Sequence, residues 1–320
     1  MNDKDLKISV VIPVYNSAQT LRELTERLEK VLRDLVGKSY EIVFVNDGSA
    51  DSSWDLLKNI ASTNDKIVAV NLTRNFGQHN ALMCGFLYAQ GEFIITLDDD
   101  LQNPPEEIPK LFKEIHTGYD VVYGIFGSKQ HSRFRNLGSA LIQFVYRKTF
   151  NVDVRISSFR IMKRHIVHRI LSYERSFTFI DGLISWFTAS IGNVYVEHQE
   201  RKIGSSGYSL HRLIVLALNM MTNFSIALVQ VASLVGLTFA FTGFAFGIYF
   251  LCKKIFLGIP VSGFASTIVA ITIFSGVQLL TLGILGEYIG RIHINVSKRP
   301  QYAIRNIVES KNHNTPDERE

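Results

Sequence analysis

Apolar and polar positions alternate in blocks along the first half of the chain, and the blocks predict strands and helices in turn. Four short apolar runs have the branched side chains of buried strands, at residues 8–14, 40–45, 67–72 and 93–97. Amphipathic stretches lie between these runs, and we expect Ser17 to cap the first helix and Ser52 to begin the second. Strands that alternate with helices predict an α/β fold, in which a parallel sheet carries helices on both faces.

Each of the four predicted strands runs into a polar turn. Right-handed crossovers would bring the carboxyl ends of all four strands to one edge of the sheet, where ligands of such folds bind. The turns are residues 15–17, 46–51, 73–79 and 98–102. We therefore expect these turns, which are distant in the sequence, to form one binding site. A further strand is predicted at residues 120–124, and a further helix from His165.

The turn after the fourth strand carries three consecutive carboxylates, Asp98 to Asp100, and is followed by a Pro-Pro step. Carboxylates this close repel one another unless a cation lies between them, and oxygen ligands suit a divalent cation. In an extended segment Asp98, Asp100 and Gln102 would project to one side as metal ligands, and Asp99 to the other. The alternative is an acidic surface turn that caps the helix beginning near Glu106.

The ligand predicted at this edge is a nucleoside diphosphate carried on a metal ion. The first turn contains neither Gly-x-Gly-x-x-Gly nor Gly-Lys-Ser/Thr, so the usual dinucleotide and P-loop phosphate sites are not predicted. Asp47 could accept hydrogen bonds from a base or a ribose, Arg74 could contact a phosphate, and a cation on the acidic turn could bridge two phosphates. The alternatives are a structural turn at Asp47, a solvated Arg74, and a His79 that caps or packs.

Two long uncharged stretches in the second half predict membrane helices. Residues 226–252 and 264–286 contain no charged side chain, and each is longer than the roughly 20 residues that cross a bilayer as a helix. An even number of crossings leaves both ends of the chain on one side. Arginine and lysine flank the pair on both outer sides, which predicts a cytoplasmic catalytic domain and tail at the inner membrane.

These patterns divide the chain into four parts. We expect a catalytic domain over residues 1–207, an amphipathic helix along the membrane interface over 208–224, two transmembrane helices within 225–290, and a cytoplasmic tail over 291–320. The tail is polar from Glu309 and is expected to be disordered there. The basic amphipathic stretch from Ser128 to Phe150 either lies on an anionic membrane surface or packs on the sheet.

Composition narrows the class of partner. The chain has 320 residues, of which 47% are hydrophobic, and a net charge of +5. This charge suits anionic lipid or phosphate, and no interleaving of basic and aromatic residues indicates a nucleic-acid partner. Cys84 and Cys252 provide neither a disulfide framework nor a metal-ligand spacing. Gly283, Gly286 and Gly290 recur near helical spacing and permit close helix packing, which leaves a homo-oligomer open.

Seven motifs between Val10 and Pro300 carry a resemblance to a known family: Val11-Ile12-Pro13-Val14-Tyr15-Asn16, Asn46-Asp47-Gly48-Ser49-x-Asp51, Arg74-Asn75-x-Gly77, Asp98-x-Asp100-Leu101-Gln102-Asn103-Pro104-Pro105-Glu106, Phe159-Arg160, Arg201-x-x-Gly204-x-Ser206 and Leu285-Gly286-Glu287-Tyr288-Ile289-Gly290-Arg291. The chain resembles the membrane-bound polyprenyl-phosphate glycosyltransferases, which are inverting enzymes of the GT-A fold. It looks most similar to the branch that moves a formylated aminoarabinose onto undecaprenyl phosphate, and the glucosyl-transferring branch is nearly as similar.

The resemblance implies a GT-A (Rossmann-like) nucleotide-sugar domain followed by a two-helix transmembrane hairpin. It implies that four residues hold the nucleoside of the donor: Pro13, Tyr15, Asp47 and Arg74. It implies that Mg²⁺ or Mn²⁺ on the donor diphosphate is held by Asp98, Asp100 and Gln102. It also implies cations that grip the lipid phosphate or the leaving diphosphate: Arg160 and Arg201, with Arg133 or Arg135.

Two positions depart from the family pattern. Ser158 stands where many members carry a carboxylate assigned as the catalytic base, and Gly207 stands where many carry a phosphate-binding lysine. A lipid phosphate oxygen is already anionic at neutral pH, so it can attack the anomeric carbon without a strong base. The reaction needs in-line positioning and a cation for the departing diphosphate, and the acidic turn meets the second requirement.

We therefore expect an inverting, metal-dependent glycosyltransferase that moves a sugar from a nucleoside diphosphate, with UDP favoured, to undecaprenyl phosphate in the membrane, for cell-envelope glycan or lipid A modification. Its catalytic residues would be Asp100, Ser158, Arg160 and Arg201. A processive polysaccharide synthase fits less well, because two spans are few for a conduit and the Gln-x-x-Arg-Trp motif is absent. The alternative from another class is a membrane-anchored binding or lipid-translocating partner with a degenerate site.

Overall fold

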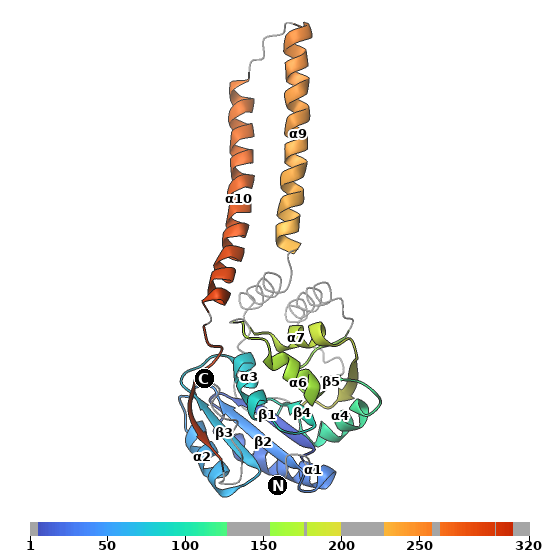
Figure 1. Cartoon of the computed structure of the whole chain (residues 1–320), viewed down its shortest axis with the longest axis vertical. Coiled ribbons are helices and arrows are strands. Elements are labelled where there is room, and N and C mark those ends of the chain that lie inside the picture. Colours follow the sequence, from blue (N-terminus) through green and yellow to red (C-terminus); the bar gives the residue numbers. More distant parts are fainter. Residues whose placement is uncertain are drawn as a thin grey trace. The chain divides into compact units, whose positions relative to one another are not determined.

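The chain forms two compact units. The computed structural model describes residues 6–126, 154–175, 178–199, 227–257, 263–297 and 299–309. One unit comprises Met1–Leu213 together with Lys298–Glu320, and the other comprises Ile214–Ser297 (Figure 1). The first unit contains a sheet with helices on its faces, and the described part of the second contains two long helices.

The sheet of the first unit is built around four parallel strands, as the apolar runs predict. They are β1 (Ile8–Val14), β2 (Tyr40–Asn46), β3 (Ile67–Leu72) and β4 (Phe93–Thr96). The spatial order is β4-β1-β2-β3, so the chain order reverses at β1. The carboxyl ends on either side of such a reversal diverge and leave a crevice, which is where ligands of parallel sheets bind.

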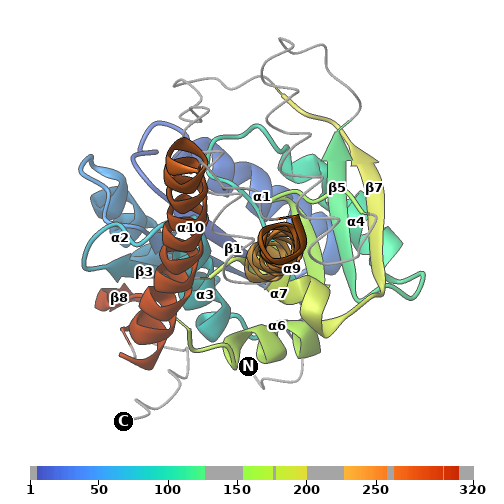
Figure 2. The ribbon, with the colours of Figure 1, turned by 90° about the horizontal axis from the view of Figure 1, so that it is seen from above.

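Four further strands extend this centre to the order β7-β5-β6-β4-β1-β2-β3-β8 among the described residues. They are β5 (Val121–Phe126), β6 (Arg160–Lys163), β7 (Ile191–Val196) and β8 (Ile304–Val308). β6 is antiparallel to β4 and β5, and β8 is antiparallel to β3. Figure 2 shows β3 and β8 on one side of the ribbon and β5 and β7 on the other. Of these four strands, β5 was predicted from the sequence. The other three were not, because short strands with polar neighbours show little periodicity.

Helices cover both faces of the central strands, which explains why those strands are continuously apolar. One face packs against α1 (Leu21–Val36), α2 (Ser53–Thr63) and α4 (Ile108–Ile115). The other packs against α3 (Gln78–Tyr88), where a Cβ atom at Gly85 would meet the side chains of Val11 and Val45. Among the described residues of this unit, the other short helices are η1 (Pro105–Glu107), α6 (Arg164–Leu171) and α7 (Ile180–Phe187).

The start of α1 corrects one prediction. The helix begins at Leu21, after Thr20, and no side chain caps it. The Ser17 hydroxyl donates instead to the Tyr15 carbonyl oxygen at 3.2 Å, and the Ser17 carbonyl accepts the Thr20 N–H at 3.0 Å. Residues 17–20 form a separate turn before the helix, so the expectation that Ser17 caps it was wrong.

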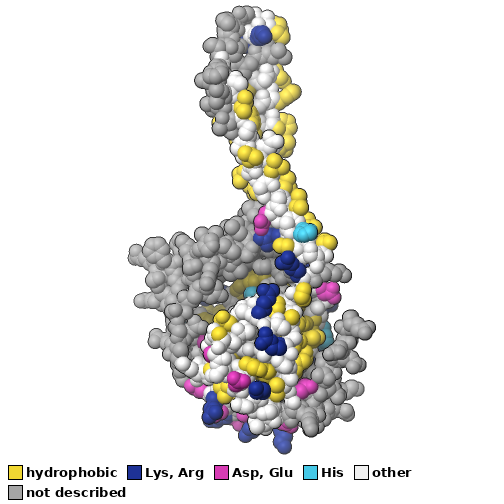
Figure 3. Space-filling model, turned by 90° about the vertical axis from the view of Figure 1, so that its left-hand side faces the viewer, with side chains coloured by type: hydrophobic (Ala, Val, Ile, Leu, Met, Phe, Trp, Pro, Cys, Tyr) yellow, Lys and Arg dark blue, Asp and Glu magenta, His cyan; other side chains and the backbone are white. Residues whose placement is uncertain are grey.

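The second unit contains, among its described residues, two apolar helices: α9 (Ala227–Leu257) and α10 (Phe264–Val296). Val229–Phe256 and Ile273–Val296 are long and apolar enough to cross a membrane, and neither stretch is buried in protein. Figure 3 shows hydrophobic side chains exposed along these helices. A helix that is apolar all round and not covered by protein is typical of a membrane-associated segment. The helix α10 ends at Val296, beyond the boundary predicted at residue 290.

Several expectations fall outside the described residues and stay predictions. They are the basic stretch 128–150 with Arg133 and Arg135, the interfacial helix 208–224, the positions Arg201 and Gly207, and the tail beyond residue 309.

Candidate active site

The turn after β1 is joined to the acidic turn through Asp99. Its Oδ2 accepts the backbone N–H of Tyr15 at 3.0 Å, and its carbonyl oxygen accepts the Thr20 hydroxyl at 2.7 Å. Desolvation raises the pKa of Asp99 to about 6, although hydrogen bonds from Ser17 and Tyr15 act to lower it. Asp99 is therefore part of the scaffold that fixes the β1 turn, and its carboxylate faces that turn, while Asp98 makes different contacts. The ring of Tyr15 remains half exposed beside the half-buried Pro13.

The acidic turn does not continue β4 as an extended segment. The strand ends at Thr96, and the buried Leu101 reverses the chain with a φ of 60°. The Asp100 Oδ1 accepts the backbone N–H of Gln102 at 3.0 Å, a contact that closes a tight turn. The strand-alternation argument for Asp98, Asp100 and Gln102 was therefore wrong in its premise. Their role as metal ligands stays a prediction and depends on the turn itself.

Asp98 is held by two side chains from different parts of the chain. The Gln78 side-chain amide donates to its Oδ1 at 2.7 Å, and the Ser158 hydroxyl donates to its Oδ2 at 2.5 Å. Burial raises the pKa of Asp98, and the nearby charge of Asp100 adds to that rise. The two carboxylates therefore lie close enough to repel each other. Ser158 was predicted as a site residue because it stands where many family members carry a carboxylate. Gln78 was not predicted, although the sequence places it at the start of a helix at the same edge of the sheet.

Asp47 shapes the loop that carries Arg74. Its Oδ1 accepts the backbone N–H of Phe76 at 2.7 Å, and its Oδ2 accepts that of Gly77 at 2.9 Å. Burial raises the pKa of Asp47, and these two hydrogen bonds oppose the rise. The exposed Arg74 guanidinium lies over the Phe76 ring, 4.7 Å from its centroid. Each Asp47 oxygen already accepts one hydrogen bond, so a nucleoside would have to bind to a remaining lone pair. Direct contact of Asp47 with a nucleoside stays a prediction.

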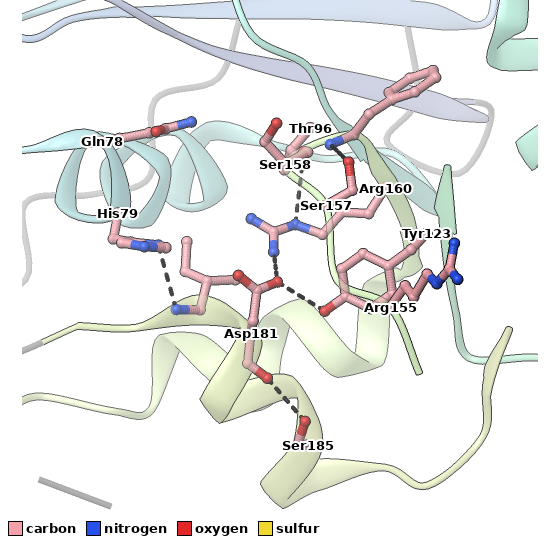
Figure 4. A network of polar contacts seen from close by, with 12 residues as sticks. Gln78, His79, Thr96, Tyr123, Arg155, Ser157, Ser158, Arg160, Asp181 and Ser185 are labelled. Carbon is pink, nitrogen blue, oxygen red and sulfur yellow. Dashed lines mark hydrogen bonds and ion pairs between the residues drawn. The ribbon is translucent and has the colours of Figure 1, made fainter. Parts of the chain in front are cut away.

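Arg160 is buried at the start of β6 in a closed polar network (Figure 4). Its guanidinium pairs with Asp181 at the start of α7, and its Nε donates to the Thr96 hydroxyl at 3.1 Å. The Tyr123 hydroxyl donates to the same Asp181 oxygen at 2.8 Å. The Thr96 hydroxyl also reaches the carbonyl oxygen of Ser158. In these contacts Arg160 supports the backbone beside Asp98. The phosphate-gripping role implied for it stays a prediction.

His79, next to Gln78, packs against α7 rather than pointing into the acidic turn. Its ring meets that of Phe179 edge-on, with centroids 5.3 Å apart, and it faces the backbone N–H of Ile180 (Figure 4). The residue keeps part of its surface exposed, yet desolvation of the imidazole lowers its pKa to about 4. The nearby Asp181 raises the pKa and Arg160 lowers it further. These contacts agree with the alternative in which His79 caps or packs.

The stretch after β7 leads toward Arg201 along the acidic turn. The backbone N–H of Gln199 donates to the Gln102 carbonyl at 2.9 Å, and that of Glu197 donates to Oε2 of Glu107 at 3.0 Å. Arg201 itself lies outside the described residues. The structure thus brings together the end of β1 with Pro13 and the turns that carry Tyr15, Asp47, Arg74, Asp98, Asp100 and Gln102. Ser158 is joined to Asp98, and Arg160 to Thr96 of β4.

The acidic turn fits a divalent cation that a substrate diphosphate helps to bind. Burial raises the pKa of Asp98, and the negative charge of the nearby Asp100 adds to the rise, so a cation bound by both carboxylates would relieve their repulsion. Within the described ranges no cluster of three or more His, Cys, Asp or Glu side chains is arranged for metal binding. Two carboxylates suffice for Mg²⁺ when phosphate oxygens and water complete its coordination.

The profile of glycosyl transferase family 2 matches residues 9–171, the stretch that carries all four polar turns. The chain belongs to glycosyl transferase family 2. It is similar to undecaprenyl-phosphate 4-deoxy-4-formamido-L-arabinose transferase of Pectobacterium carotovorum, with 39% identity across 97% of this chain and 96% of the relative. The transferase of the same name from Yersinia pestis strain Pestoides F is 38% identical across 96% and 95% of the two chains. A glycosyltransferase is therefore the enzyme class of this protein.

A solved structure shares the GT-A fold of this family 2 enzyme. This structure is the glucosyl-3-phosphoglycerate synthase of Mycobacterium tuberculosis, crystallised with Mn²⁺, UDP and phosphoglyceric acid. The two structures match over 69% of this chain and 78% of the synthase chain, with a TM-score of 0.50. At 18% sequence identity this likeness concerns the fold. The predicted α/β class and its GT-A arrangement are confirmed.

Proposed function

We propose that this glycosyltransferase moves 4-deoxy-4-formamido-L-arabinose from UDP to undecaprenyl phosphate. The observation that carries the proposal is the 39% identity to a transferase of that name, which extends over 97% of this chain and therefore includes both the acidic turn and the apolar helices. The polar turns of the sequence separately favour a nucleoside-diphosphate donor, and the lipid phosphate acceptor is what the family resemblance implies. The identity of the sugar is inferred from the names of the relatives, because sugar hydroxyls are recognised by scattered loop residues that form no sequence motif.

The reaction is a single displacement at the anomeric carbon. A phosphate oxygen of the lipid forms a bond to that carbon, the bond from the carbon to the UDP oxygen breaks, and UDP leaves with the electron pair. Attack from the side opposite to UDP inverts the anomeric centre. No proton must leave the nucleophile, because a phosphate monoester is anionic at neutral pH. The protein's task is to hold the two phosphates in line and to neutralise the leaving group.

Asp98 and Asp100 would hold Mg²⁺ or Mn²⁺ against the donor diphosphate, with Gln102 as a neutral oxygen ligand. When bound, the cation stabilises the negative charge that develops on the departing UDP. Gln78 and Ser158 orient the Asp98 carboxylate for this role through their hydrogen bonds to its two oxygens. Outer partners of this kind hold ligands of metal sites in position.

Ser158 has a role that differs from that of a general base. Its hydroxyl donates a hydrogen bond to Oδ2 of Asp98, so the proton of Ser158 is directed at the metal-binding carboxyl group. A serine in that position orients the metal ligand, and the anionic acceptor makes a base unnecessary. Arg201, with Arg133 or Arg135, would bind the acceptor phosphate.

The two apolar helices would anchor the catalytic domain at the cytoplasmic face of the inner membrane. Val229–Phe256 and Ile273–Val296 have the length and composition of membrane spans, and the lipid acceptor is itself a membrane molecule. A cysteine at Ile259, in a chain whose two native cysteines are replaced by serine, should react with a membrane-impermeant maleimide from the periplasmic side of intact cells. A cysteine at Ser310 should react only after the cells are opened. Reversed labelling would overturn the orientation.

The function is tested by transfer from UDP-linked 4-deoxy-4-formamido-L-arabinose and UDP-glucose to undecaprenyl phosphate, with Mn²⁺, with Mg²⁺ and with EDTA. We expect a lipid-linked product from the first donor, dependent on the cation. Asp100→Ala should abolish it, and Asp55→Ala, which removes an exposed carboxylate on α2, should not. Product from UDP-glucose alone would reassign the sugar. A folded protein that binds undecaprenyl phosphate but transfers neither sugar would favour the binding or translocating alternative.

A further inference from the structure

The final strand of the chain is joined to the loop that carries Arg74. β8 pairs with β3 in antiparallel register, Val70 opposite Ile307 and Asn71 opposite Asn306, with an irregularity between Asn71 and Leu72. The pairing then continues past the end of β3. The backbone N–H of Thr73 donates to the Ala303 carbonyl oxygen at 2.9 Å.

Arg305 completes a clamp on Thr73. Its guanidinium donates to the Thr73 carbonyl oxygen at 2.9 Å, so both backbone polar groups of Thr73 are bound by the C-terminal strand. Thr73 directly precedes Arg74, whose side chain is exposed over Phe76. The position of Thr73 thus determines where the loop with Arg74 leaves the sheet.

The rest of this loop is held from the side of β2. Gly48, with a φ of 66°, lies so close to the loop that a Cβ atom would come within 2.5 Å of the Arg74 carbonyl carbon and the Asn75 nitrogen. Asp47 binds the next two backbone N–H groups, those of Phe76 and Gly77. β8 on one side and the β2 turn on the other therefore fix the backbone of residues 73–77 between them.

The segment that carries β8 is itself well anchored to the catalytic domain. The Gln301 side-chain amide donates to the carbonyl oxygens of Tyr173 and Arg175, both at 2.8 Å. Tyr302 lies near Cys84 and Tyr88 of α3, and desolvation, followed by the charges of these two groups, raises the pKa of its phenol. Because the segment is a fixed part of the sheet, its hydrogen bonds to Thr73 can hold the backbone of the loop in place.

We propose that β8 is a positioning element for donor binding, and that Arg305 acts on the nucleoside-diphosphate sugar through the 73–77 loop. This inference rests on the proposed function and on the role that the family resemblance implies for Arg74, which is to contact the donor. Arg305 is a positioning residue, because it touches the loop backbone and no reacting atom. The chain thereby uses residues that follow its last apolar helix to complete the binding site formed near its beginning.

The test measures KM for the UDP-sugar and for undecaprenyl phosphate separately. Arg305→Ala should raise the donor KM by about threefold to tenfold, the effect of one lost hydrogen bond, with the acceptor KM unchanged and the thermal midpoint lowered by no more than about 4 °C. Arg305→Lys, which keeps a donor for the Thr73 carbonyl, should restore part of the loss. Lys58→Ala is the matched control, because it removes an exposed cation of α2 whose ion-pair partner is Asp55 of the same helix. An unchanged donor KM in Arg305→Ala, or an equal rise in both KM values, would overturn the inference.

A double mutant separates this inference from the function on which it rests. If Arg305 acts through the loop, its effect on the donor KM should shrink in an Arg74→Ala background, because coupled residues are not additive. If Arg74→Ala alone leaves the donor KM unchanged, the proposed role of Arg74 fails. Amide hydrogen exchange of residues 72–78 then still reports on the clamp: faster exchange in Arg305→Ala supports it, and unchanged exchange refutes it.

Discussion

At the scale of single residues, the site depends on side chains that hold other side chains. Asp98 receives hydrogen bonds from Gln78 and Ser158, and Asp99 holds the backbone of Tyr15. Glutamine at the start of a helix has no motif that marks it as part of a metal site. Its importance follows from its 2.7 Å contact with a carboxylate whose charge is disfavoured by burial.

Replacing Gln78 tests this support. Gln78→Ala removes one of the two donors that orient Asp98, and losses of such outer partners weaken metal binding or activity by about tenfold to a hundredfold. We expect a higher Mn²⁺ concentration at half-maximal transfer, with a normal thermal midpoint. Gln90→Ala is the control, because Gln90 lies beyond the other end of α3 and its backbone contact with Glu41 survives the change. An unchanged Mn²⁺ dependence would contradict the role of Gln78.

His79 should make stability depend on pH. Desolvation lowers its pKa to about 4 in the folded protein, against 6.5 for the free side chain. Between these values the unfolded state binds the proton and the folded state does not, so the free energy of unfolding falls as pH decreases from 6.5 toward 4. Thermal unfolding of the detergent-solubilised enzyme should therefore show a steeper loss below pH 6.5 than that of His79→Asn. Parallel curves would show that the His79 pKa is not lowered.

At the scale of elements, the buried pair of Arg160 and Asp181 joins β6 to α7. The sequence motif Phe159-Arg160 favoured a phosphate contact for this arginine, whereas the structure gives it a partner from a helix further along the chain. Burial of an arginine without a partner is very unfavourable, so the pair stabilises the arrangement of both elements around Tyr123 and Thr96.

Removing one partner of the pair should lower the free energy of unfolding far more than replacing both partners by apolar residues. Asp181→Ala leaves the Arg160 charge buried and should lower the free energy of unfolding by about 3–5 kcal/mol. The double variant Arg160→Met with Asp181→Leu replaces both charges by apolar groups and should recover much of that loss. Urea denaturation of the solubilised enzyme measures both. If the single variant is as stable as the unchanged enzyme, the ion pair does not join the two elements as described.

At the scale of the whole molecule, the catalytic unit is built from both ends of the chain. Lys298–Glu320 belongs to the same compact unit as Met1–Leu213, and the two apolar helices are an insertion in sequence between these parts. The residues after the last span were expected to form a tail, and β8 shows that part of this tail belongs to the sheet.

Two truncations test this arrangement. Ending the chain after Lys298 removes β8 and uncovers the edge of β3, so we expect the thermal midpoint of the catalytic unit to fall by about 5 °C or more. Ending it after Glu309 keeps the strand and should leave the midpoint unchanged. If both truncated enzymes unfold at the same temperature as the full chain, β8 does not contribute to the stability of the sheet.

The amino-acid pattern alone was enough to predict the central strands, the edge at which the polar turns meet and the two apolar spans. These follow from local periodicity and from the fixed hand of parallel crossovers, which do not depend on distant residues. The conformation of the acidic turn, the Arg160–Asp181 pair, the Gln78 contact and the return of β8 were decided by tertiary structure. Each of them joins residues far apart in the chain, or, at Leu101, a backbone conformation that burial has to stabilise, and no local pattern records such a choice.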